Sequence, residues 1–228
     1  MRGPHVEDAR AFDADALLVL RRAAEELRWL LGRGYPSPSA LATVGNHHQL
    51  TTRQRVALSR CCAAPAACAD RLARKLTDAA LHDADVHVDA LNLIITLEVA
   101  LAGGPLLRGD EGALRDLAGL RGSYRLLPET RTAAQLVRAH LHTCGARSAQ
   151  WWIDAPVSNS GRLRALLLDT DPTWSATLVA DADRELFDRS HVISADALVL
   201  DRCRSWIDLA SSLVATQIEH PWVIDLRT

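Results

Sequence analysis

Three aspartates occupy equivalent places in the sequence, because each lies at, or just past, the carboxyl end of a predicted strand. They are Asp89, Asp154 and Asp196. The predicted strands before them are short apolar segments at residues 86–88, 151–153 and 192–194. In open parallel sheets, ligands bind outside the carboxyl ends of the strands. We therefore expect the three carboxylates to converge on one edge of a sheet.

Carboxylates that converge repel one another unless a cation neutralises them. Oxygen ligands without a paired thiolate or imidazole favour Mg²⁺ or Mn²⁺, so either ion is the expected cofactor at Asp89, Asp154 and Asp196. A cation held in this way polarises a phosphoryl oxygen and activates water to hydrolyse a phosphodiester. Asn92, about one helical turn after Asp89, is expected to orient a metal-bound water or a phosphate. Asp110, in a loop after Gly109, is a candidate fourth metal ligand.

The alternative interpretation of these acids is structural. An aspartate at the end of a strand is a common N-cap for the following helix, and each of the three precedes a predicted helix. Asp110 is equally compatible with a solvated cap. The shared edge of the sheet favours a site over three separate caps.

The segment that follows Asp154 contains groups suited to phosphate. A predicted helix begins there, so backbone amides add to the side chains. The candidate substrate-binding residues are Ser158, Asn159, Ser160 and Arg162. An ordinary capping loop is the alternative.

A second candidate contact with substrate lies near the N-terminus, where Arg53 and Arg55 could bind a phosphate backbone. A solvated basic helix, or ion pairs with the acidic part of the chain, would explain them equally well. Of the 228 residues, positions 1–80 hold 12 basic and 8 acidic side chains, and positions 81–228 hold 14 and 20. The division indicates a basic module that meets phosphates and an acidic module that holds metal.

The hydrophobic period changes near residue 82, which predicts two domains. Residues 1–80 are expected to form a helical domain without strands, with apolar positions at helical spacing. Residues 81–228 are expected to form an α/β domain whose strands alternate with helices, which is typical of a parallel sheet covered on both faces. The further strands are predicted at residues 174–179, 206–207 and 221–226.

Several classes of protein have no support in the sequence. Hydrophobic residues make up 48% of the chain, which excludes wholesale disorder. Five cysteines, no signal peptide and no run of 18 apolar residues predict a cytoplasmic protein with reduced thiols and no membrane contact. Cys61, Cys62 and Cys68 lack zinc-finger spacing, and the histidine pairs at 47–48 and 140–142 do not share a helix face. Dinucleotide-binding, P-loop and serine-hydrolase motifs do not occur.

The chain resembles the family called domain of unknown function 434 over about residues 30–210. The matching segments include residues 35–36, 39–41, 44–45, 53–55, 88–98, 103–107, 154–162, 194–196 and 200–202. The resemblance implies a helical N-terminal domain followed by a PIN-like domain, the fold of many metal-dependent ribonucleases. The Asp89 and Asn92 pair is similar to the opening motif of the related NYN nucleases. Ala90 departs from the pattern, because glycine is customary there.

Together these observations predict a metal-dependent nuclease that acts on RNA. A non-catalytic PIN-like module that binds nucleic acid or protein is the first alternative. A phosphohydrolase for small phosphate esters is the second, although a basic appended domain favours a polymer. The pattern leaves open whether the chain is a homo-oligomer.

Overall fold

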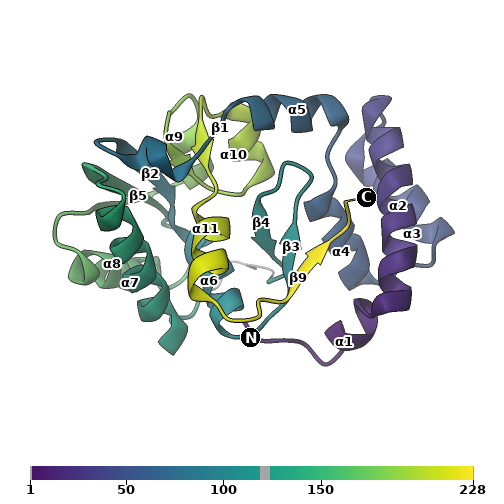
Figure 1. Cartoon of the computed structure of the whole chain (residues 1–228), viewed down its shortest axis with the longest axis horizontal. Helices are drawn as coiled ribbons and strands as arrows, with labels where there is room; N and C mark the ends of the chain where they lie inside the picture. Colours follow the sequence, from purple (N-terminus) through teal and green to yellow (C-terminus); the bar gives the residue numbers. More distant parts are fainter. Residues whose placement is uncertain (1, 119–123, 228) are drawn as a thin grey trace.

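A computed structural model describes residues 2–118 and 124–227. Its order of elements separates an N-terminal group of helices from a mixed C-terminal region (Figure 1). We call the first group the helical unit. It consists of α1 (Asp8–Ala11), α2 (Ala14–Gly32), α3 (Ser37–His47), α4 (Thr52–Cys61) and α5 (Pro65–Ala73).

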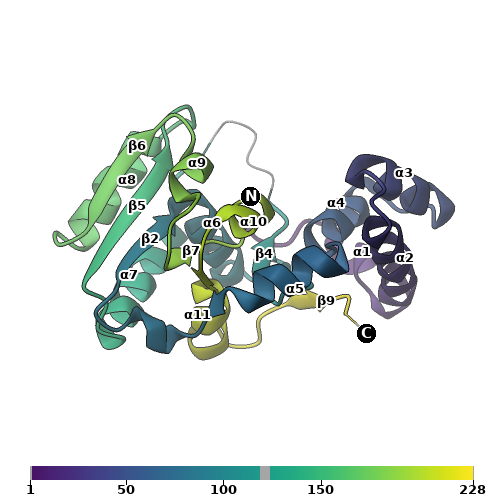
Figure 2. The same ribbon diagram turned by 90° about the horizontal axis from the view of Figure 1, so that it is seen from above.

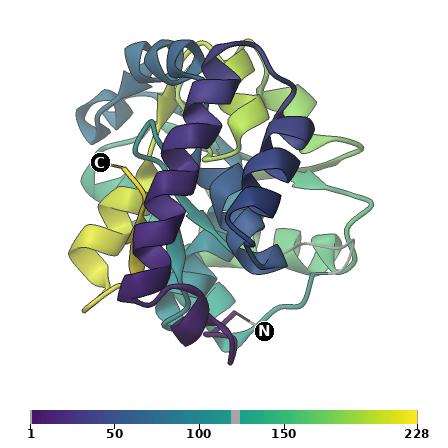
Figure 3. The ribbon, with the colours of Figure 1, turned by 90° about the vertical axis from the view of Figure 1, so that its right-hand side faces the viewer.

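Local sequence signals set the ends of these helices. The Asp13 carboxylate accepts a hydrogen bond from the Ala16 amide and caps α2, and Thr51 and Gln54 form a capping box at the start of α4. After α2 the chain turns, and α3 begins at Ser37, directly behind Pro36. Figure 3 shows α2 and α3 side by side on this end of the molecule.

A six-stranded parallel sheet confirms the predicted α/β architecture. Its order is β1-β8-β7-β2-β5-β6, and every neighbouring pair is parallel. The strands are β1 (Lys75–Leu76), β2 (Asp85–Asp89), β5 (Ser148–Asp154), β6 (Ser175–Val179), β7 (Val192–Ile193) and β8 (Trp206–Ile207). The prediction of no strand before residue 80 is wrong, since β1 extends this sheet beside β8.

Helices cover both faces of the main sheet, which explains why its strands are largely apolar. One face packs on α6 (Ala90–Leu101), α7 (Pro128–Thr143), α8 (Ser160–Thr170) and α11 (Leu209–Gln217). The other face packs on α9 (Ala182–Leu186) and α10 (Ala197–Arg202). Successive residues serve opposite faces, as Trp151 and Trp152 do. A 3₁₀ helix, η1 (Asp78–Leu81), leads into β2.

A second, smaller sheet lies between the helical unit and the main sheet (Figures 1 and 2). Its order is β4-β3-β9, built from β3 (Leu106–Arg108), β4 (Leu114–Asp116) and β9 (Val223–Asp225). The two β3 residues Leu106 and Leu107 belong to different cores, one beside α6 and one shared with the helical unit. The strand predicted at 221–226 therefore exists, but it joins this small sheet and brings the end of the chain back to the N-terminal helices.

Candidate active site

A cavity of about 590 Å³ opens between the carboxyl edge of the main sheet and the helical unit. Asp89, Asn92, Asp154 and Asp196 all contribute to its wall, so the structure brings together the acids that the sequence singled out. The direction of the strand order reverses between β2 and β7. Asp89 ends β2, and Asp196 follows β7, so the cavity lies at the crevice where open α/β sheets bind ligands.

Asp89 is the most enclosed of these acids, with 5% of its surface exposed. One carboxylate oxygen accepts a hydrogen bond from the backbone amide of Asn92, at 3.3 Å, and the other accepts from the Ser194 hydroxyl, at 2.8 Å. Burial raises the pKa of Asp89 to about 7, and the nearby carboxylates of Asp183 and Asp196 add to the rise. The Asp89 carboxylate is therefore crowded by negative charge and receives no direct ion pair among the described residues.

Hydrogen bonds connect the side chains of Asn92 and Ser194 to the loop that carries Asp196. The Asn92 amide oxygen accepts from the Ala195 amide at 2.9 Å, and the Ser194 hydroxyl oxygen accepts from the Asp196 amide at 3.0 Å. Asn92 thus holds the loop after β7 against the start of α6. In the described structure its side-chain oxygen is engaged with protein, which makes it a positioning residue as well as a wall of the cavity.

The cap interpretation and the site interpretation both describe Asp89 and Asp196. Asp89 caps α6, and Asp196 caps α10 by accepting from the amides of Leu198 and Val199. A capping carboxylate has a free edge that can face a cavity, so the two roles are compatible. Asp154 differs, because it accepts from the Ala182 amide of α9 at 2.8 Å and does not cap the helix that follows it.

A fourth acid of the cavity, Asp183, was missed by sequence reasoning. It lies on α9, just past the end of β6. Burial, followed by the carboxylates of Asp196 and Asp154, raises its pKa to about 6. The position after a strand could have identified it, as it did the other acids. Residues 181–185 include three acids and follow the predicted strand 174–179.

The opposite wall of the cavity comes from α4, α5 and the β3–β4 hairpin, and its arginines pair with Glu111 and Asp116, which line it too. It includes Arg60, Arg71 and Arg115. Arg115 donates to the Ala195 carbonyl at 2.7 Å and to the Arg60 carbonyl at 2.8 Å, and it pairs with Glu111 at 2.6 Å. Arg60 bonds Asp116 through one nitrogen, while 32% of its side chain stays exposed. Arg60 is therefore the arginine of this wall best placed to meet a phosphate.

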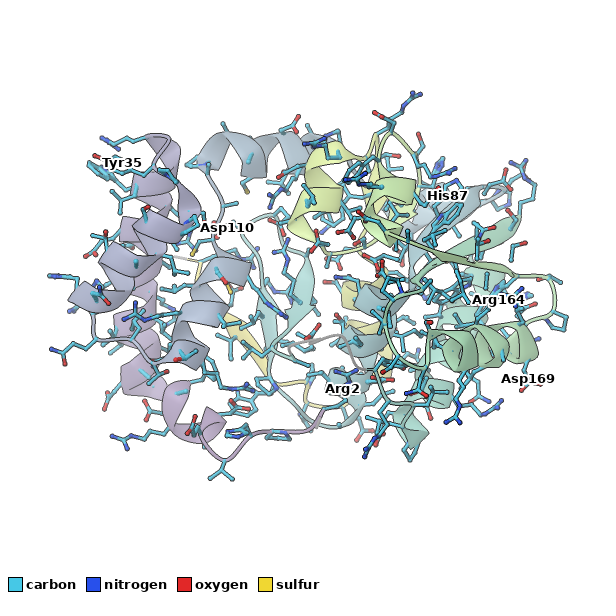
Figure 4. All side chains as sticks on the ribbon, turned by 180° about the vertical axis from the view of Figure 1, so that it is seen from behind. Arg2, Tyr35, His87, Asp110, Arg164 and Asp169 are labelled. Atoms are coloured by element: carbon cyan, nitrogen blue, oxygen red, sulfur yellow. The ribbon has the colours of Figure 1, made fainter. Side chains whose placement is uncertain are left out.

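The structure places Asp110 outside this cavity. Both of its oxygens accept from the Arg28 guanidinium, at 2.8–3.0 Å, and one also accepts from the Ala63 amide. Figure 4 shows Asp110 on the helical side of the molecule. The expectation of a fourth metal ligand at Asp110 does not fit this geometry, because its charge is already neutralised by Arg28.

The loop after Asp154 also lies away from the cavity wall. The side chains of Ser158 and Asn159 bond the backbone of Tyr124, and the Ser160 hydroxyl donates to the Ala155 carbonyl. Asn159 adopts a left-handed conformation with φ 63°, and Arg162 is exposed. These contacts hold the loop against Tyr124 without a side-chain cap on α8, and they give no support to phosphate binding by the first three residues.

Arg53 and Arg55 are occupied within the helical unit. Arg53 forms an ion pair with Asp8, whose side chain is fully buried. Arg55 donates to the Leu50 carbonyl and to the Asn46 side chain, each at 3.0 Å. Neither arginine lines the acidic cavity, so their local role is to hold the helices together.

The carboxylate wall suits a hydrated divalent cation better than a closed cage. Among residues 2–118 and 124–227, two groups of three possible ligand atoms lie within 4.8 Å of one another, and neither contains a cavity acid. Mg²⁺ keeps several of its waters and needs only one or two direct carboxylates. The all-oxygen donor set and the raised pKa values of Asp89 and Asp183 fit such an ion.

Comparisons with known proteins define the family. Residues 78–212 match the family model described as Domain of unknown function (DUF5616), and residues 19–74 match Protein of unknown function (DUF434). The chain therefore belongs to the DUF5616 family, with a DUF434 segment before it. The resemblance to DUF434 is confirmed for the N-terminal helices, whereas the region that contains the cavity acids matches a separate family.

One relative covers nearly the whole chain. An uncharacterized protein of Methanocaldococcus jannaschii is 25% identical over 209 residues, which cover 89% of this chain and 98% of the relative. The alignment therefore spans residues of both the helical unit and the main sheet. No solved structure matches the chain.

The remaining expectations concern thiols and membranes. All five cysteines are unpaired, and Cys61 and Cys62 lie at the edge of the cavity. Burial raises the pKa of both thiols, so they are protonated at neutral pH. In the described part of the chain, no helix combines the length and apolar character needed to cross a bilayer.

Proposed function

We propose that this protein is a metal-dependent nuclease that hydrolyses phosphodiester bonds of RNA, with a PIN-like arrangement of its acids. One observation carries the proposal: four aspartates from the carboxyl edge of a parallel sheet share a cavity with an arginine wall. Asp89, Asp154, Asp183 and Asp196 would hold Mg²⁺ or Mn²⁺ there. The bound cation would polarise a phosphoryl oxygen and lower the pKa of a coordinated water.

The two walls of the cavity have different roles in the proposed reaction. The carboxylates supply negative charge that is incompletely neutralised, which favours a cation over a lone phosphate. Arg60 offers its partly exposed guanidinium to a phosphate of the strand. Asn92 keeps the loop of Asp196 in register with α6, so that these acids face the same space.

A polymer substrate fits the cavity better than a small phosphate ester. The cavity is bounded by the main sheet and by the helical unit, and the region between Arg28 and Lys75 has eight basic residues and one acid. Most of these basic side chains pair with acids, as Arg28 does with Asp110, so Arg60 at the cavity is the one that offers a contact to a further phosphate of a strand.

The first test is cleavage of labelled single-stranded RNA, with DNA of matched sequence, in Mn²⁺, Mg²⁺ or EDTA. We expect RNA cleavage that depends on the metal and falls at least about 100-fold in Asp154→Asn. Asparagine can still accept from the Ala182 amide, so the fold is retained. Asp169→Asn is the matched control, since Asp169 is exposed on α8 (Figure 4). Cleavage by Asp154→Asn at the wild-type rate would overturn the proposal.

Binding of the same RNA, measured over a range of salt concentrations, tests the arginine wall. Arg60→Gln should weaken RNA binding several-fold and reduce the slope of log affinity against log salt by about one. Arg131→Gln is the control, because Arg131 is an exposed arginine on α7 that pairs with Asp169.

The second candidate function is a non-catalytic module that binds nucleic acid. It is favoured by the spacing of the cavity acids, since no three of the described ones approach within 4.8 Å. Such a module would bind RNA with the salt dependence described above and leave it intact in every metal.

A further inference from the structure

A second cluster of metal-ligand side chains lies at the other edge of the main sheet. Asp78, His140 and Cys144 each place one ligand atom within 4.8 Å of the other two. Asp78 begins η1, which leads into the amino end of β2, and the other two lie at the end of α7, which leads into the amino end of β5. The acidic cavity lies at the carboxyl ends of the same strands, so the two sites are separate.

We propose that Asp78, His140 and Cys144 form a zinc site with three protein ligands. Thiolate, imidazole and carboxylate are the donor types of protein zinc sites. This donor set differs from the all-carboxylate wall of the cavity, and the inference does not depend on the nuclease proposal.

Helical spacing orients two of the ligands. His140 and Cys144 are four residues apart on α7, so their side chains share one face of the helix. His142, two residues after His140, points to another face of the helix and bonds Asp171 at 2.5 Å. The helical pair that matters is therefore His140 with Cys144.

Existing hydrogen bonds already orient the third ligand. The Asp78 carboxylate lies 2.7 Å from the His140 ring nitrogen through one oxygen, and it accepts from the Ser212 hydroxyl at 3.0 Å through the other. Ser212 lies on α11. A bonded carboxylate of this kind, held by a neighbour outside the ligand set, is typical of metal sites in which outer partners fix the ligands.

His82 lies near this group but outside the three residues whose ligand atoms lie within 4.8 Å of one another. The ring of His82 lies against Gly145, directly after Cys144, at 3.2 Å from the position that a side-chain carbon would take there. Gly145 has φ 72°, so it ends α7 and lets the chain turn beside this ring. Three protein ligands leave the fourth position of a tetrahedral zinc ion to water.

Zinc at this place would link three elements. It would tie η1 to the end of α7, with α11 attached through Ser212, and so fix the segment that leads into β2. As zinc binds, bonds to the metal replace the hydrogen bond between Asp78 and the His140 ring, and the Cys144 thiol releases its proton to solvent. The other group of possible ligands, Glu26, His47 and His48, lies at the surface and has no thiol, so we propose no zinc site there.

The test is titration of chelator-treated full-length protein with Co²⁺ and Zn²⁺. We expect the near-ultraviolet absorption of a cobalt–thiolate bond, its displacement by Zn²⁺, and a rise in melting temperature with Zn²⁺ concentration. Cys144→Ser should abolish the absorption. Ser212→Ala should weaken affinity about tenfold, because it removes only an outer partner.

Cys62→Ser is the matched control, since Cys62 is a half-buried thiol at the acidic cavity. It should leave the cobalt spectrum unchanged. If wild type shows no cobalt–thiolate absorption, or if the absorption survives Cys144→Ser and disappears in Cys62→Ser, the proposal is wrong. His140→Asn gives a second variant, which should lose Zn²⁺ affinity with the Cys144 thiol still present.

Discussion

Asp89 combines a capping bond with an unfavourable electrostatic environment. Its pKa is raised above the value of about 4 that an unfolded chain would have, so the folded state binds the proton more tightly. The free energy of unfolding should therefore fall as pH rises from about 4 to about 7 in metal-free protein. A bound cation would reverse this loss.

Asp89→Asn isolates that effect, because asparagine cannot ionise. At pH 8 without metal, the variant should be more stable than wild type by about 4 kcal/mol, and at pH 5 this advantage should shrink to about 1 kcal/mol. Urea unfolding at the two pH values, with EDTA present, measures it. Equal stability of the variant and wild type at both pH values would show that Asp89 acts as a cap alone, because asparagine caps about as well as aspartate.

Residue types identified most of the cavity acids, but they could not identify the neighbours. Asp89, Asp154 and Asp196 follow strands, and this position is visible in the hydrophobic pattern. Asp110 was expected at the same site because it lies in a loop after a glycine. Its partner, Arg28, is 82 residues away in the chain, and no local pattern indicates such a pair.

At the scale of elements, the hairpin of β3 and β4 is what the sequence did not predict. Each strand has three residues, too few for a period of two to be recognised. The parallel sheet was predictable, because its strands are apolar and alternate with long helices. The position of β9 could not be predicted, because its pairing with β3 depends on how both sheets pack.

This hairpin joins the helical unit to the loop of Asp196 through Arg115. Replacing Arg115 by Met would leave Glu111, whose side chain is fully buried, with Arg71 as its remaining ion pair at 3.4 Å. We expect a loss of about 3 kcal/mol in the free energy of unfolding. Urea unfolding measures it, with Arg108→Met as the control from β3.

The double variant Arg115→Met with Glu111→Gln should recover part of that stability, since the buried charge is gone. If Arg115→Met unfolds at the same urea concentration as wild type, the ion pair does not hold the hairpin against the loop.

At the scale of the whole molecule, charge and topology bring the two halves of the chain to one cavity. The basic helical unit lies on one side and the acidic edge of the sheet on the other. The division expected at residue 80 is less clean in the structure, because β1 joins the main sheet and β9 returns to the helices. The cavity walls therefore depend on contacts between segments far apart in the sequence.

The central claim is that the aspartates of this cavity bind a divalent cation. Calorimetric titration with Mn²⁺ tests it most directly, in a Cys144→Ser background that removes the thiolate of the zinc site. We expect saturable Mn²⁺ binding, with an affinity that Asp183→Asn weakens at least about tenfold. Asp181→Asn should bind as before, because Asp181 caps α9 and asparagine caps equally well. No binding up to millimolar Mn²⁺, or equal binding by Asp183→Asn, would contradict the account.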